Sequence, residues 1–357
     1  MLNIDTKYKH MSQLAGYRED LKKKPVLKNL FLELTLRCNE HCLHCGSYCG
    51  DVRCEELTLE QYKTFFEEIK DDFGTKGFML CITGGEPLLR KDFFDIMGYA
   101  HKLGFKWGMT SNGTLITPEI AEKLYEAGMS TISVSIDGLE DTHNAFRQTP
   151  DGYRKAMEGI QNLINVGKFK AIQVTTVVTH QNIGELDALY EVFDKMDIDS
   201  WRVINIEPMG RAKLHLELIL TKEDYRYMME FIRNKRMNGE PVEYGCSHYL
   251  GGEYEHEIRD WYFICSAGLY VASITTNGDI IACLDIERRP ELVQGNILKD
   301  RFKDVWENRF KEFRIDLSDR CDKCQDCSEK DRCHGDSYHS WDFEKNEPIL
   351  CFRDILF

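Results

Sequence analysis

Apolar residues alternate between short continuous runs and helical spacing over the first two thirds of the chain. The run at 31–36 predicts a short buried strand. One helix face should follow, because apolar residues then recur every three or four positions, at Leu59, Tyr62, Phe65, Phe66, Ile69 and Phe73. Five more strand–helix pairs are predicted, with strands at 78–83, 105–110, 131–136, 171–178 and 201–206 and helices near 92–103, 118–127, 153–166, 186–196 and 222–235.

Six such units predict an α/β fold with parallel strands and right-handed crossovers, that is, a partial (βα)6 TIM-like barrel. The active site of such a barrel lies at the carboxyl ends of its strands. From about Gly239 the pattern changes to short elements, turn residues and cysteines, which predicts a small cysteine-rich α+β domain. The expected organisation is an N-terminal extension at 1–30, the barrel at 31–238 and the second domain at 239–357.

Composition narrows the class of protein. No run of about 18 apolar residues occurs, and residues 1–24 lack the apolar centre of a signal peptide, so we expect a cytoplasmic protein without a membrane partner. A net charge of −14 without a basic stripe argues against a nucleic-acid partner. The 14 cysteines are clustered, with five at 38–54 and eight at 246–351, and a reducing compartment favours metal binding or catalysis for such thiols.

The strongest motif is Cys38, Cys42 and Cys45, a CxxxCxxC pattern just after the first predicted strand. Three thiolates on one loop can bind three irons of a four-iron, four-sulfur cube and leave the fourth iron open to another ligand. A structural zinc site or unrelated buried thiols are the alternatives. The spacing, the position of the loop and the six-fold rhythm resemble radical S-adenosylmethionine (SAM) enzymes.

That resemblance implies a set of SAM-binding residues. Segment 84–87 is similar to the family's GGEP segment, which binds the amino group of SAM; Glu86 supplies an acceptor, and the glycines permit a close backbone approach. Segments 110–114 and 133–138 resemble those near the ribose and the methionine carboxylate. Arg147 resembles the arginine that pairs with this carboxylate, its alternative being a surface ion pair. The implied set is His44, beside adenine, with Gly84, Gly85, Glu86, Pro87, Ser111, Asn112, Ser135, Asp137 and Arg147.

The C-terminal cysteines resemble the SPASM domain, which holds two auxiliary iron–sulfur clusters; a zinc ribbon is the alternative. Family correspondence implies an outer cluster on Cys324, Cys327, Cys333 and Cys351. The inner cluster would use Cys265 and Cys283, but Ser337 stands where the family has a cysteine. We therefore predict that Cys246 and Cys321 complete it. The chain would then carry three 4Fe-4S clusters, with about twelve irons in all.

The resemblance implies reductive cleavage of SAM to a 5′-deoxyadenosyl radical, with the electron supplied by a flavodoxin- or ferredoxin-type donor. SPASM relatives mostly modify ribosomally made peptides or protein side chains, so we expect a crosslink or an oxidation of this kind. The alternatives are a small-molecule substrate such as a tetrapyrrole or cofactor precursor, and a non-catalytic zinc-binding scaffold. About 30 residues precede the first strand, too few for a leader-binding domain, so a separate leader-binding protein or direct core recognition is expected.

Asp285 is the candidate catalytic carboxylate. In sulfatase-maturating relatives an aspartate base directly follows the second hairpin cysteine, whereas here Leu284 holds that place and Asp285 comes one position later. One step along a strand reverses the side-chain face, so Asp285 is expected to point elsewhere, and we predict that formylglycine is not made by that route. Cys81 is interpreted as a core residue, while Cys49 and Cys54 have no assigned partner.

Overall fold

The computed structural model describes residues 4–50, 54–259 and 262–356, so residues 1–3 of the predicted extension lie outside it. Its main feature is a ten-stranded sheet in the order β10-β9-β8-β1-β2-β3-β4-β5-β6-β7, with β1 to β7 parallel. The strands are β1 (Asn29–Glu33), β2 (Met79–Thr83), β3 (Trp107–Ser111), β4 (Met129–Ser135), β5 (Ala171–Val178), β6 (Ser200–Asn205), β7 (Val242–Tyr244), β8 (Val271–Ile274), β9 (Asp279–Ile281) and β10 (Gly295–Asn296).

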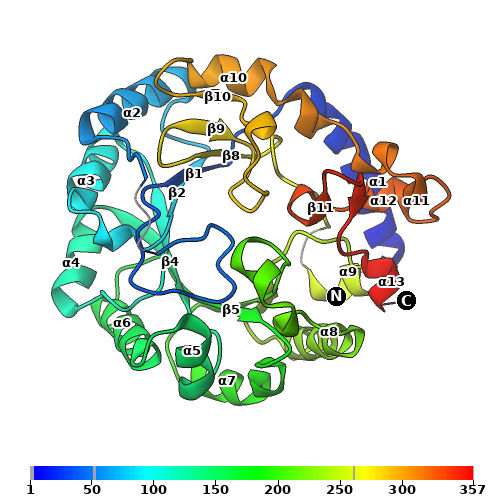
Figure 1. Cartoon of the computed structure of the whole chain (residues 1–357), viewed down its shortest axis with the longest axis horizontal. Helices are drawn as coiled ribbons and strands as arrows, with labels where there is room; N and C mark the ends of the chain where they lie inside the picture. The colour runs from blue at the N-terminus through cyan, green and yellow to red at the C-terminus, as the bar shows by residue number, and fades with distance from the viewer. Residues whose placement is uncertain (1–3, 51–53, 260–261, 357) are drawn as a thin grey trace.

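Helices surround this sheet on its outer side (Figure 1). They are α1 (Ile4–Lys23), α2 (Leu59–Phe73), α3 (Phe93–Leu103), α4 (Pro118–Glu126), α5 (Glu140–Arg147), α6 (Gly152–Val166), α7 (Leu186–Phe193), α8 (Lys222–Met237), α9 (Gly252–Ile258), α10 (Phe302–Asn308), α11 (Asp322–Gln325), α12 (Lys330–Cys333) and α13 (Phe352–Leu356). Thr58 and Gln61 form a capping box at the start of α2, which satisfies backbone groups that a helix start leaves free. Within the described ranges, no helix has the length and apolar character needed to cross a membrane.

The predicted α/β class and the six strand–helix pairs are confirmed, and the bounds of β5 coincide with the prediction. Helix α1 was not predicted. Its Leu14 and Leu21 are buried, and Arg18 forms an ion pair of 2.7 Å with Asp316 near the other end of the chain. The polar N-terminal extension is therefore a helix packed against the C-terminal region.

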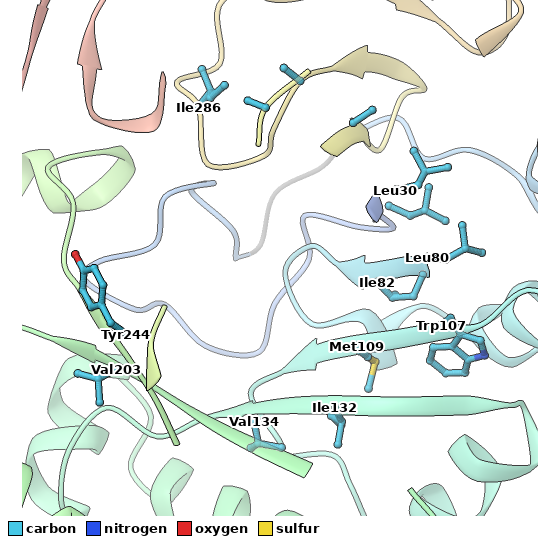
Figure 2. Packing of buried hydrophobic residues seen from close by; sticks show 14 of the residues in the cluster. Leu30, Leu80, Ile82, Trp107, Met109, Ile132, Val134, Val203, Tyr244 and Ile286 are labelled. Carbon is cyan, nitrogen blue, oxygen red and sulfur yellow. The ribbon is translucent and has the colours of Figure 1, made fainter. Parts of the chain in front are cut away.

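The sheet continues past the predicted boundary at 238/239. Strands β7 and β8 both come after this boundary in the sequence. They nevertheless extend the same sheet, because β7 pairs with β6 and β8 pairs in parallel with β1. Figure 2 shows Tyr244 from beyond the boundary beside Val203, its partner in the β7–β6 pairing, and both Tyr244 and Ile286 belong to the same buried cluster as Leu30. The boundary stays a prediction, and the two parts share one core.

Candidate active site and metal centres

The three cysteines of the CxxxCxxC motif lie on the loop that leaves the carboxyl end of β1. Cys38, Cys42 and Cys45 line one cavity of about 220 Å3. Arg211 fixes the loop from the β6–α8 connection, because its Nε donates to the carbonyl oxygen of Cys42 (2.7 Å) and its Nη1 donates to that of Cys49 (2.8 Å). Three thiols held on one cavity wall fit a four-iron cluster with one open iron.

The protonation of these thiols depends on their surroundings. Burial raises the pKa of Cys38 to about 11 and raises that of Cys42 as well. A hydrogen bond from the Cys49 thiol lowers the pKa of Cys45, whose sulfur also lies 3.3 Å from the backbone nitrogen of Cys49. Two of the three thiolates therefore need a bound metal to be stable at neutral pH. Cys49, which had no assigned partner, is thus a neighbour of the motif.

The two glycines of the GGEP segment lie against the cysteine loop. A Cβ at Gly84 would lie 2.3 Å from the carbonyl oxygen of Thr35, and one at Gly85 would lie 2.1 Å from that of Arg37. The backbone nitrogen of Gly85 donates to the Thr35 carbonyl at 2.7 Å. Both glycines line the 220 Å3 cavity, so their first physical role is the close approach of two backbone segments that form its wall.

A side chain at Gly85 should therefore disturb the cavity. We expect Gly85→Ala to lower the free energy of unfolding by about 1–3 kcal/mol through overpacking against backbone. Gly98→Ala is the matched control, because nothing lies within 4 Å of a Cβ there, and alanine in a helix is expected to raise stability by about 0.5–1 kcal/mol. Thermal unfolding of both variants tests this. Equal midpoints for the two would contradict it.

Glu86 is fully buried, and the protein itself uses its carboxylate. Both oxygens accept from Ser111 Oγ (3.1 and 3.0 Å), and they also accept from the backbone nitrogens of Asn112 (2.9 Å) and Leu88 (3.2 Å). Burial raises the pKa of Glu86 to about 7. The family resemblance implies that this carboxylate binds the ammonium of SAM. In the structure it joins β2 to β3, and the glycines before it line the cavity.

Arg147 lies between two buried carboxylates. Its Nη2 is 2.6 Å from Asp137 Oδ2, and its Nη1 is 2.8 Å from Glu40 Oε2. Burial would raise the pKa of Asp137, but Arg147 and His44 more than offset this, and the net shift is downward. His44 stacks on Phe146 with ring centroids 4.4 Å apart, and burial lowers its pKa to about 4. Arg147 therefore forms buried ion pairs and not a surface ion pair. Through Glu40 and Asp137 it links the cysteine loop to the end of β4.

The cavity collects most of the residues that the resemblance implied for SAM. Those in its wall are His44, Gly84, Gly85, Ser111, Asn112, Ser135 and Arg147. Glu86, Pro87 and Asp137 are buried but do not line it. The role of each residue toward SAM stays a prediction.

Asp285 lies in the wall of this cavity, together with Leu284. We expected its side chain to point elsewhere because side chains alternate along a strand. The alternation does not apply here, because β9 ends at Ile281 and Asp285 lies in a turn, so the direction of its side chain stays a prediction. Asp285 also accepts a hydrogen bond from the Cys283 thiol (3.8 Å) and lines a second cavity.

The C-terminal thiols form two groups. Cys246, Cys265 and Cys283 line the second cavity, of about 410 Å3. The four cysteines of the predicted outer cluster, Cys324, Cys327, Cys333 and Cys351, line another. Cys321 was predicted to complete the inner group, but its thiol shares a hydrogen bond with that of Cys324 and it lines neither cavity, so its role as an inner ligand stays a prediction. The spacing of the cysteines does not show that Cys321 lies beside Cys324. That position follows from the 3-10 turn at Leu317–Arg320, which directly precedes Cys321.

The fold and the three-thiol cavity at the carboxyl edge of its sheet define an α/β-barrel iron–sulfur enzyme. Comparison with known proteins gives the family: residues 32–193 match the radical SAM superfamily, and residues 265–328 match the SPASM iron–sulfur cluster-binding domain. The chain belongs to the radical SAM superfamily, as the sequence resemblance indicated. Membership sets aside the non-catalytic zinc scaffold.

Relatives of two kinds are similar to this chain. Mycofactocin maturase MftC of Mycolicibacterium smegmatis is 31% identical, over 85% of this chain and 76% of its own. The AdoMet-dependent heme synthase of Methanosarcina barkeri is 29% identical, over 90% of this chain and 95% of its own. Among solved structures, anSMEcpe with bound AdoMet has a TM-score of 0.73 at 19% identity, covering 92% of this chain and 94% of its own. Streptococcus suis SuiB bound to S-adenosylmethionine has a TM-score of 0.68 at 19% identity, covering 88% of this chain and 74% of its own. At these identities the two solved structures show the fold alone.

Proposed function

We propose that the enzyme cleaves SAM reductively and modifies a peptide or protein side chain. Cys38, Cys42 and Cys45 would hold the SAM-binding cluster, which when bound supplies the electron that splits SAM. The cavity walls hold SAM and exclude water, while the two C-terminal thiol groups hold auxiliary clusters. The electron would come from a flavodoxin- or ferredoxin-type donor.

The observation that carries the peptide proposal is the charge of a large adjoining cavity. This cavity of about 740 Å3 shares Ser47 with the SAM cavity and shares Cys283 and Ile286 with the inner thiol cavity. Its volume suits several peptide side chains. Four carboxylates line it against two arginines, namely Glu33, Glu55, Asp279 and Glu287 against Arg288 and Arg289.

Both arginines are already paired by the protein. Arg288 lies 2.6 Å from Glu33, and Arg289 lies 2.6 Å from Glu291 and 3.6 Å from Glu287. Among its described residues this wall has excess negative charge and no unpaired guanidinium, which favours a neutral or basic segment of peptide. It disfavours a substrate with several carboxylates, which would meet like charge at close range.

The second candidate substrate is a tetrapyrrole. The heme synthase of Methanosarcina barkeri matches over nearly its whole length, and a relative from the same organism is named Fe-coproporphyrin III synthase, 26% identical over 91% of this chain and 85% of its own. Apolar residues in the 740 Å3 cavity, including Leu292, Val293 and Phe313, offer contacts to a flat macrocycle.

Substrate-dependent nucleoside formation distinguishes the two. The reconstituted enzyme would be incubated anaerobically with SAM and dithionite, and with either Fe-coproporphyrin III or peptides from short open reading frames beside its gene. We expect a peptide to raise 5′-deoxyadenosine formation and to lose hydrogen, seen as a mass decrease of about 2 Da per oxidation or crosslink. Turnover of Fe-coproporphyrin III with no peptide modified would overturn the proposal.

A further inference from the structure

Three side chains from distant parts of the chain meet beside the inner thiol cavity. Glu207 follows β6, His248 follows β7, and His339 lies in the 3-10 turn at Tyr338–Ser340. Their ligand atoms lie within 4.8 Å of one another. His248 Nε2 is 2.5 Å from Glu207 Oε1 and 3.3 Å from His339 Nε2, which is 3.7 Å from the same carboxylate oxygen.

Both imidazoles are held by their other nitrogen. His248 Nδ1 lies 2.7 Å from Asp336 Oδ2, and His339 Nδ1 lies 2.7 Å from Ser337 Oγ. A histidine that binds a metal through one nitrogen almost always uses the other in such a hydrogen bond, which fixes the orientation of the ring. Here both Nε2 atoms face the same carboxylate.

The distances suit a small divalent ion. Ligand atoms placed tetrahedrally at about 2.1 Å from an ion are separated by about 3.4 Å. Two of the three observed separations, 3.3 and 3.7 Å, lie close to this value. The third, 2.5 Å, is a hydrogen bond between Glu207 and His248, and an ion that replaces its proton would widen it.

Glu207 also has an unused acceptor. Its Oε1 accepts from Asn205 Nδ2 (2.7 Å) and from His248, whereas its buried Oε2 has no hydrogen-bond partner in the described part of the chain. A buried polar atom without a partner destabilises the folded protein. A metal ion bound by both carboxylate oxygens of Glu207 would satisfy Oε2 as well as contact Oε1.

We propose that Glu207, His248 and His339 bind one divalent transition-metal ion, Zn2+ or Fe2+. Two imidazole nitrogens and one carboxylate oxygen suit these ions, whereas Mg2+ and Ca2+ prefer oxygen alone. Glu207 and His339 also line the 410 Å3 cavity, so the remaining coordination positions of the ion are open to a molecule bound there. The site adjoins the inner thiols in this cavity, but none of its three ligand atoms is a thiol, and the proposal does not depend on the identity of the substrate.

Zinc binding to the intact enzyme tests the site. Fully reconstituted protein would be treated anaerobically with Zn2+, desalted and analysed for zinc and iron, and crystals would be examined by anomalous diffraction at the zinc edge. We expect one zinc per chain, with its anomalous peak between the two Nε2 atoms. Glu207→Gln and His339→Ala should each weaken Zn2+ binding at least about tenfold without loss of iron.

The matched control is a second histidine–carboxylate pair. His215 Nδ1 lies 3.1 Å from Glu217 Oε1 at an exposed position, and His215→Ala should leave zinc binding unchanged. The proposal would be overturned by the absence of an anomalous peak between the two Nε2 atoms at both the zinc and the iron edges, by a zinc peak at the thiols alone, or by unchanged zinc binding in both site variants. Loss of about four irons in His339→Ala would also overturn it, because His339 would then be a ligand of the inner cluster.

Discussion

Replacing Cys38, Cys42 and Cys45 together by alanine is expected to reduce 5′-deoxyadenosine formation to the level seen without enzyme. The three thiols share one cavity with most of the residues implied for SAM, and they are the iron ligands that the proposed function assigns to it. The measurement is chromatographic quantification of the nucleoside after anaerobic incubation with SAM and dithionite. The loss should be complete, because no other cysteine group lies in this cavity apart from Cys49, which alone cannot hold a cluster.

The C-terminal thiols serve as an internal control in the same variant. They line other cavities, so the protein should stay brown and lose about four irons relative to the wild type. About eight remaining irons would support two auxiliary cubes, and about four would mean one. Cys81→Ala is the matched single variant, because Cys81 lies on β2 in contact with Asn29 and should have no effect. Nucleoside release at the wild-type rate from the triple variant would refute the assignment.

Local patterns were sufficient to predict the barrel. Buried parallel strands appear in the sequence as short apolar runs, and the run at 171–178 matches β5 at both ends. The CxxxCxxC loop could also be placed, because it directly follows such a run. Helix α1 was missed because it is mostly polar: of its described side chains only Leu14, Arg18 and Leu21 are buried, and the partner of Arg18, Asp316, lies far along the chain.

The pairing of site residues depends on tertiary contacts that spacing does not encode. Arg147 is 107 positions from Glu40, and His248 is 91 positions from His339. Nothing in the local sequence indicates that Glu86 bonds to Ser111 or that Cys321 joins the outer thiols. For Asp285 the sequence also misleads about secondary structure, because the strand that would have fixed its orientation ends four residues earlier. The residue types of the site could be predicted, but not which of them pair with one another.

Arg147→Met is expected to lower the free energy of unfolding by about 3–5 kcal/mol, because it leaves Asp137 and Glu40 buried without a counter-ion. Arg154→Met is the matched control. Arg154 pairs with Glu158 at 2.7 Å on the surface, where such pairs contribute about 0–1 kcal/mol. Thermal unfolding at a fixed scan rate gives the comparison. Adding Asp137→Asn and Glu40→Gln to Arg147→Met should restore much of the loss, because the unpaired charges are then removed.

The loss caused by Arg147→Met should also depend on pH. In the wild type the pKa of Asp137 is lowered, so its contribution to stability is present at neutral pH and is lost as the pH falls through the folded-state value. In the variant, burial without Arg147 raises this pKa, and acid relieves the unfavourable charge by protonating the carboxylate. The gap between the two proteins should therefore be largest near pH 7 and shrink toward pH 4. A variant as stable as Arg154→Met that has lost SAM affinity would instead mean that Arg147 serves the methionine carboxylate, as the family resemblance implies.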